Sequence, residues 1–177
     1  MTQPATLDAP AQLIDGETLK IERLLPGPAS RIWDYLTNSD LRRQWLAAGE
    51  MEPRVGGAVS LTWRNDELND PPGRRPDGFD EEHSLEAQIT VWDPPRKLAY
   101  TWNSTGGVSF ELEPRGDEVL LTLIHSRIAD RGSRVGISAG WHMHLAIMAA
   151  KLKGETPPDF WSGWSALKAD YEARIPA

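Results

Sequence analysis

The stretch Gly136–Leu152, GISAGWHMHLAIMAAKL, is the one long apolar segment of the sequence, and it decides the fold. At 100° per residue its bulky side chains fall on one side of a helix, whereas its alanines add helix propensity without bulk. These bulky residues are Ile137, Trp141, His144, Leu145, Met148 and Leu152. Such a stripe needs a facing surface, so the sequence predicts a long helix over about 136–153 that packs against a sheet.

The segments before this helix are predicted to be short strands. Alternating apolar residues bounded by turn residues indicate strands at 18–25, 59–63, 85–92, 97–102, 108–113 and 119–125. Strands that follow one another through tight turns form an antiparallel sheet. We therefore expect an α+β protein with the helix-grip arrangement, in which a curved antiparallel sheet of about six strands surrounds the long helix.

Two short helices are expected after the first strand. Apolar residues at helical spacing predict a helix over 30–37. Asn38 or Ser39 is placed to cap a second helix over 41–46, which would turn Trp45 inward.

The two ends of the chain differ in composition. Residues 1–17 are rich in Pro, Ala, Thr and Gln and are predicted to form a flexible arm, which leaves 18–177 as a single domain. Near the C-terminus, prolines are followed by apolar residues at helical spacing, so a shorter helical extension over about 160–175 is expected to pack back onto the body.

Composition limits the possible classes of function. The sequence has no cysteine, which excludes disulfides, zinc ribbons and thiol nucleophiles. A formal net charge of −7 disfavours nucleic acid or an anionic membrane surface as a partner, because phosphate binding depends on Lys and Arg. No apolar run approaches the roughly 20 residues that span a bilayer, and the N-terminus lacks the pattern of a signal peptide. We expect a cytoplasmic monomer or homodimer with no nucleic-acid or membrane partner.

A long, diffuse pattern runs from Leu19 to about Gly154. It comprises Arg23, Pro28, Trp33, Trp45–Leu46, Gly56–Gly57, Glu86, Trp92–Pro95, Leu98–Trp102, Leu121–His125 and Gly140–Trp141. In these residues the sequence resembles the Hsp90-ATPase-activator-homologue (AHSA-type) branch of the START-like, or SRPBCC, superfamily. The resemblance implies a cavity between the sheet and the long helix, which in many relatives holds an apolar or amphipathic ligand. Members of the superfamily include ligand carriers, polyketide aromatase/cyclase domains and the cochaperone that names the branch.

Aromatic residues of several strands and the helix stripe are predicted to line this cavity. The predicted ligand-binding residues are Trp63, Glu86, Tyr100, Trp102, Phe110, Trp141, His144 and Met148. We therefore expect a START-like domain that binds a small apolar or amphipathic ligand, with no reaction assigned. The first alternative is a cochaperone-like interaction module of the Hsp90-activator type, with a chaperone as partner. The second is a cyclase-like or hydrolase-like enzyme.

Arg23 lies on the same parity as the apolar residues of its strand, and an interior guanidinium must be paired. The strand carboxylates available for pairing are Glu86, Glu111 and Glu113, of which we favour Glu86. The sequence predicts a buried structural ion pair between Arg23 and Glu86. The alternative is that the pair anchors the headgroup of a ligand.

Residues Gly136–Gly140 spell G-x-S-x-G, the nucleophile-elbow pattern of serine hydrolases. The elbow needs an acid and then a histidine further along the chain. The histidines that follow are His142 and His144, immediately after the motif and with no acid before them. We therefore predict no catalytic residue here, but a helix start capped by Ser133 or Ser138, in which the last glycine of the motif allows close packing against the sheet.

The same two histidines bear on metal binding. At i and i+2 on a helix they point about 200° apart, so a shared metal ion is not expected, and neither is another cofactor. His144, on the bulky stripe, is placed to hydrogen-bond a ligand or act as a general base. The alternative is a core histidine satisfied by a backbone carbonyl.

A long irregular segment spans 65–83. A loop of this length inside a compact domain is either functional or disordered. Two alternatives follow for it: a lid over the mouth of the cavity, or a disordered acidic excursion.

Overall fold

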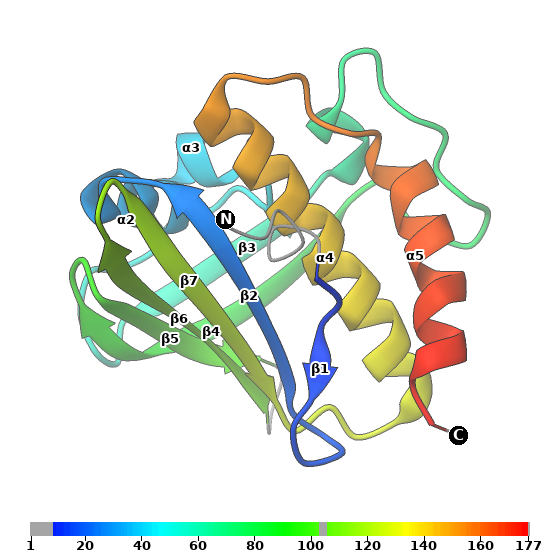
Figure 1. The fold of residues 1–177 in the computed structure, drawn as a ribbon, viewed down its shortest axis with the longest axis horizontal. Coiled ribbons are helices and arrows are strands. Elements are labelled where there is room, and N and C mark those ends of the chain that lie inside the picture. Colours follow the sequence, from blue (N-terminus) through cyan, green and yellow to red (C-terminus); the bar gives the residue numbers. More distant parts are fainter. Residues whose placement is uncertain (1–8, 103–105, 177) are drawn as a thin grey trace.

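The computed structural model describes residues 9–102 and 106–176, which form a curved sheet with one long helix across its concave face (Figure 1). Seven antiparallel strands lie in the order β1-β2-β7-β6-β5-β4-β3. The strands are β1 Gln12–Leu13, β2 Leu19–Pro26, β3 Ala58–Trp63, β4 His83–Asp93, β5 Lys97–Trp102, β6 Gly106–Arg115 and β7 Glu118–Ser126. This is the helix-grip fold, so the predicted architecture is confirmed, with one strand more than the six expected.

The helices also follow the predicted order. They are α2 Ala29–Thr37, α3 Ser39–Arg42, α4 Arg131–Lys153 and α5 Phe160–Arg174, with a short 3-10 helix, η1, at Asn65–Leu68. The side chain of Asn38 caps α3 by accepting a hydrogen bond from the backbone of Leu41 at 3.2 Å. Helix α3 ends at Arg42, before Trp45, but Trp45 is fully buried as expected.

The extra strand lies in the segment predicted to be a flexible arm. Residues 1–8 of that arm are outside the described residues, but Leu13 pairs with Leu19 of β2. The backbone N–H of Ala11 also donates to the hydroxyl of Tyr171 at 2.7 Å. The prediction is therefore wrong for this part of the arm, because a two-residue strand held by backbone pairing leaves almost no pattern in the sequence.

Helix α4 begins five residues before the predicted start. The carboxylate of Asp130 accepts a hydrogen bond from the backbone N–H of Ser133 at 2.8 Å, so Asp130 is the N-cap. The predicted cap by Ser133 or Ser138 is wrong, since both lie inside the helix. The first turn is polar and exposed, and for that reason it carries no apolar periodicity.

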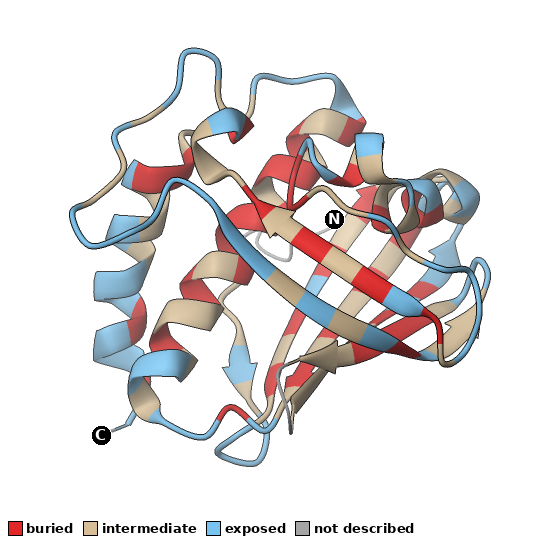
Figure 2. Cartoon of the chain, turned by 180° about the vertical axis from the view of Figure 1, so that it is seen from behind, coloured by how far each residue is buried: buried red, intermediate tan, exposed pale blue. Residues whose placement is uncertain are grey.

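Two surfaces cover α4, the sheet on one side and α5 on the other (Figure 1). The stripe against the sheet includes Leu145 and Met148, both fully buried. On the α5 side, Val135 and Ala139 form a second buried cluster with Tyr171. Figure 2 shows the resulting burial along α4 and the alternation of more and less buried residues along the strands. Sequence periodicity predicts only the first of the two buried faces of α4.

Candidate ligand-binding pocket

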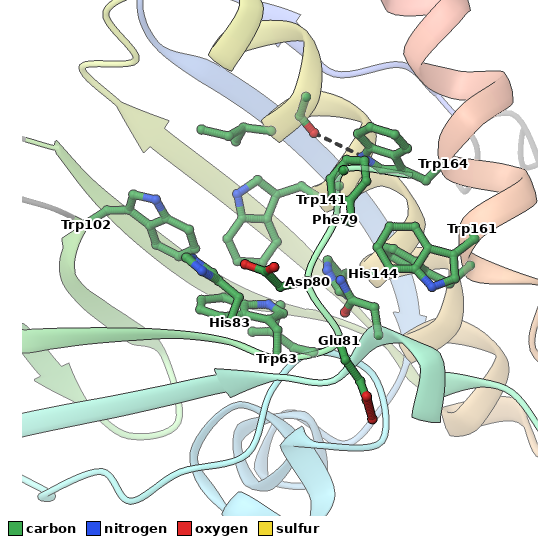
Figure 3. A pocket seen from close by; sticks show the side chains of 17 residues that line it. Trp63, Phe79, Asp80, Glu81, His83, Trp102, Trp141, His144, Trp161 and Trp164 are labelled. Carbon is green, nitrogen blue, oxygen red and sulfur yellow. Dashed lines mark hydrogen bonds between the residues drawn. The ribbon is translucent and has the colours of Figure 1, made fainter. Parts of the chain in front are cut away.

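A pocket of about 390 Å³ opens where the sheet, the first half of α4, the start of α5 and the loop 69–82 meet (Figure 3). This volume lies within the range of small-molecule sites. The pocket is lined by Leu46, Trp63, Asn65, Gly78, Phe79, Asp80, Glu81, His83, Trp102, Gly136, Ile137, Gly140, Trp141, His144, Phe160, Trp161 and Trp164.

Trp63 and Trp102 of the sheet and Trp141 of α4 form one wall of the pocket. Trp63 ends β3, where Val59, Leu61 and Trp63 alternate inward, and Trp102 ends β5. The ring centroids of Trp63 and Trp102 are 5.6 Å apart, and those of Trp102 and Trp141 are 5.7 Å apart. These inclined contacts are the arrangement that aromatic rings prefer, so they fix the three side chains against one another.

Four aromatic residues form the opposite wall. Phe160 and Trp161 open α5, with ring centroids 4.9 Å apart. Phe79, from the loop, packs at 5.2 Å from Trp161 and 5.0 Å from Trp164. The indole N–H of Trp164 donates to the carbonyl of Gly136 at 3.3 Å, which ties α5 to α4 (dashed in Figure 3).

His144 joins the two walls. Its ring lies 6.4 Å from that of Trp141 and 4.8 Å from that of Phe160. Its Nδ1 is 2.8 Å from the carbonyl oxygen of Trp45. Since a carbonyl only accepts, Nδ1 carries the hydrogen. Burial lowers the pKa of His144 to about 4, so the ring is neutral near pH 7 and Nε2 is left as an acceptor.

A second buried histidine supports the pocket from behind. His125 of β7 is 1% exposed, and its Nδ1 accepts a hydrogen bond from the indole N–H of Trp141 at 2.9 Å. Burial lowers the pKa of His125 to about 4. His125 does not line the pocket, but it sets the orientation of a residue that does.

The loop 69–82 is attached to the start of α5. The amide of Asn69 donates to the carbonyl of Pro158 at 2.8 Å and accepts from the backbone N–H of Phe160 at 2.9 Å. Just before the loop, Asp66 accepts from the indole N–H of Trp161 at 2.7 Å and pairs with Arg75. These contacts make the loop a wall of the pocket, which fits the lid alternative.

Gly136 and Gly140 lie one turn apart on α4 and both line the pocket. A Cβ added at either position would meet no atom within 4 Å. The prediction that Gly140 permits close packing is therefore wrong. Glycine inside a helix costs about 0.5–1 kcal/mol relative to alanine, and here its effect is to leave the pocket wall bare.

The pocket brings together half of the predicted ligand-binding residues. Trp63, Trp102, Trp141 and His144 line it. Tyr100, Phe110 and Met148 are at most 2% exposed and belong to the packed core instead. The pocket occupies only one end of the space between sheet and α4, because core side chains fill the rest.

Arg23 and Glu86, predicted to form an ion pair, lie far apart in the sheet. Their strands, β2 and β4, are separated in the sheet by β5, β6 and β7. Glu86 is exposed and accepts a hydrogen bond from the hydroxyl of Ser60 at 2.8 Å. The predicted ion pair is therefore not formed, and Glu86 does not line the pocket. Arg23 is buried as expected, and its Nη1 donates to the carbonyl of Glu22 at 2.7 Å.

Sequence reasoning missed the wall made by the loop and α5. Phe79 is the one Phe, Trp or Tyr residue in the segment 65–83, and Phe160–Trp161 follow a pair of prolines and Asp159. Aromatic residues at these positions were the available signal. Their pairing depends on contacts between distant parts of the chain, which periodicity does not report.

No group of three His, Asp or Glu residues that could hold a metal ion occurs within 9–102 and 106–176. In the same residues, no helix is long and apolar enough to cross a membrane.

Residues 26–153 match the family described as activator of Hsp90 ATPase homolog 1-like protein. The chain belongs to this family. Membership of this family, together with the helix-grip fold, identifies the chain as a START-like domain. The resemblance seen in the sequence is therefore confirmed. No curated protein matches it in a sequence comparison.

Solved structures share the fold of this family member. The protein encoded by gene BPP1335 from Bordetella parapertussis is 35% identical over 100% of this chain and 97% of that chain, with a TM-score of 0.80. CalU16 from Micromonospora echinospora is 18% identical over 94% of both chains, with a TM-score of 0.65. A conserved protein of unknown function from Enterococcus faecalis, EF2215, is 22% identical over 93% of this chain and 88% of that chain, with a TM-score of 0.65. The last two similarities show the fold alone.

Proposed function

We propose that this START-like domain binds one small apolar or amphipathic molecule in the pocket between the sheet, α4, α5 and the loop 69–82. The observation that carries the proposal is the bare helix surface at Gly136 and Gly140, which faces walls built from seven Trp and Phe side chains. Apolar pockets with a few polar groups are typical of small-molecule sites.

The hydrolase-like alternative is not supported by the position of its serine. Ser138 lies inside α4, is 1% exposed and does not line the pocket. A nucleophile elbow requires the serine to be presented at a sharp turn between a strand and a helix. The geometry therefore favours binding over acyl transfer at this motif.

A fluorescent apolar probe tests the proposal. N-phenyl-1-naphthylamine is neutral at pH 7, and its emission rises in apolar surroundings. We expect saturable binding of one probe molecule per chain. Gly140→Leu places an isobutyl group in the pocket, since nothing lies within 4 Å of the added Cβ. This variant is expected to weaken probe binding by about tenfold or more, because the side chain takes up part of the ligand's volume.

The matched control is Gly132→Leu, on the same helix but exposed and outside the pocket. It should bind the probe as the unmodified protein does, and circular dichroism should show that both variants are folded. Equal binding by folded Gly140→Leu and the unmodified protein, or no binding by either, contradicts the proposal.

The cochaperone-like alternative rests on the description of the family. It stays a prediction, which stimulation of an Hsp90 ATPase by this protein would support.

A further inference from the structure

The charged side chains at the pocket are acidic. Asp80 and Glu81, both exposed, line its mouth, and neither has an ion pair within the described residues. Neighbouring carboxylates are already compensated, Glu82 by Arg64 at 2.7 Å and Asp66 by Arg75. In Figure 3, Asp80 points from the loop toward the aromatic side chains, whereas Glu81 points away from them. Asp80 is therefore the carboxylate placed to meet a ligand.

No Lys or Arg is among the described residues that line the pocket. The residues outside the described ranges, 1–8, 103–105 and 177, contain no Lys or Arg in their sequence either. An anionic ligand would therefore find no lysine or arginine on the pocket wall, and it would be repelled by Asp80.

His144 offers a hydrogen-bond acceptor to the pocket. His144 is 6% exposed and uses Nδ1 to reach the Trp45 carbonyl, which leaves Nε2 as an acceptor. A buried acceptor without a donor costs free energy, and a donor on a bound ligand would recover it.

Most of the indole donors around the pocket are already used. The N–H groups of Trp141, Trp161 and Trp164 donate to His125, Asp66 and the carbonyl of Gly136, respectively. The faces of these rings carry the negative side of the aromatic quadrupole, which attracts cations, and tryptophan does so most strongly.

We infer that the ligand of this pocket is an organic cation, an ammonium group with at least one N–H carried on an apolar, ring-sized body. The carboxylate of Asp80 balances the charge of the head, Nε2 of His144 accepts a hydrogen bond from its N–H, and the tryptophan walls cover the body. This inference rests on the proposed function, since it names the class of ligand for the same pocket.

Three probes with one body and different heads test the inference by isothermal titration calorimetry at pH 7. They are 2-(1-naphthyl)ethylamine, which is cationic, 2-(1-naphthyl)ethanol, which is neutral, and 1-naphthaleneacetate, which is anionic. We expect the amine to bind tightest and the acetate weakest, with about tenfold between amine and alcohol from the charge-assisted contacts. Asp80→Asn keeps the shape of the side chain and should reduce this preference for the amine to about threefold or less.

The matched control is Asp77→Asn, which makes the same chemical change at an exposed position of the same loop outside the pocket. It should leave the order and spacing of the three affinities unchanged. Equal binding of amine and alcohol, or a preference that survives Asp80→Asn, overturns the inference. If the neutral fluorescent probe still binds in that case, the proposed function stands and only the cationic class is wrong. If neither the probe nor any naphthyl compound binds, both fail.

Discussion

The indole N–H of Trp141 donates to Nδ1 of His125 across 2.9 Å, which links the middle of α4 to β7 in the buried interior. An indole nitrogen only donates, so Nδ1 of His125 is unprotonated and the neutral ring carries its hydrogen on Nε2. Both residues are at most 3% exposed. The bond therefore holds the Trp141 ring in the position where one of its faces lines the pocket.

Replacing Trp141 by Phe should destabilise the fold beyond the loss of ring volume, because it leaves Nδ1 of His125 buried without a donor. Such an orphaned group costs about 1–3 kcal/mol. Trp33→Phe is the matched control, since Trp33 is also buried but donates no indole hydrogen bond to another described residue. Urea denaturation should show a larger loss for Trp141→Phe by at least about 1 kcal/mol. Equal losses for the two variants would contradict this role of the bond.

The stability of the protein should fall as the pH drops from about 6.5 toward 4. Burial lowers the pKa values of His125 and His144 to about 4 in the folded state. Between these limits the unfolded chain binds protons on both rings and the folded chain does not. Each ring should thus remove about 1.4 kcal/mol per pH unit from the free energy of unfolding.

Urea denaturation between pH 7 and pH 5 measures this slope. In His144→Asn the side-chain amide nitrogen takes the place of Nδ1 and can donate to the Trp45 carbonyl. This variant should show about half of the slope that the two histidines give together. A slope that is the same in this variant and in the unmodified protein rules out a neutral, buried His144.

Arg42 is a structural residue that the sequence does not reveal. It is 1% exposed, and its guanidinium donates to the carbonyls of Leu36, Thr37, Ala47 and Gly49. Replacing it by Met keeps much of the volume but leaves these carbonyls without their donor. We expect the free energy of unfolding to fall by at least about 3 kcal/mol, since each buried group left unsatisfied costs about 1–3 kcal/mol.

Arg43→Met provides the comparison at the next position. Arg43 is about half exposed and forms a 3.4 Å surface ion pair with Glu67. The change in unfolding free energy should stay within about 0.5 kcal/mol. If Arg42→Met and Arg43→Met destabilise equally in chemical denaturation, Arg42 does not hold this part of the chain together.

Gly136 and Gly140 should lower the stability of the protein relative to alanine at the same positions. Gly136→Ala and Gly140→Ala add a methyl group that meets no atom within 4 Å, so each should stabilise α4 by about 0.5–1 kcal/mol. At Gly163 of α5 the added Cβ would lie 2.6 Å from Sδ and Cε of Met143, and the gain should be smaller or absent there. Thermal denaturation of the three variants distinguishes the positions, and a loss of stability at Gly136 or Gly140 would show that those sites are close-packed after all.

Short-range periodicity was enough to predict the helix-grip framework. In β2, Leu19, Ile21, Arg23 and Leu25 all face the interior, as their shared parity indicates. The inward orientation of Trp63 at the end of β3 follows from the same rule. These features depend on residues a few positions apart, which is the range that sequence patterns report.

The limits of the pocket depended on contacts between distant segments. Trp161 reaches the pocket because Asp66, 95 residues earlier, holds its indole nitrogen. The predicted ion pair puts Glu86 in the interior, whereas the register of β4 places it on the outer face beside Ser60. The sequence of one alternating strand does not show which set of side chains faces inward when both sets include polar residues. The pairing with neighbouring strands decides the orientation.

The indole N–H signals in a proton–nitrogen correlation spectrum provide the most direct test of the pocket. The sequence has eight tryptophans. Trp63, Trp102, Trp141, Trp161 and Trp164 line the pocket, and Trp33, Trp45 and Trp92 do not. Titration with N-phenyl-1-naphthylamine is expected to shift signals of the first group and to leave those of the second nearly unchanged. Shifts confined to Trp33, Trp45 and Trp92, or no shifts at a saturating concentration of the probe, would contradict binding in this pocket.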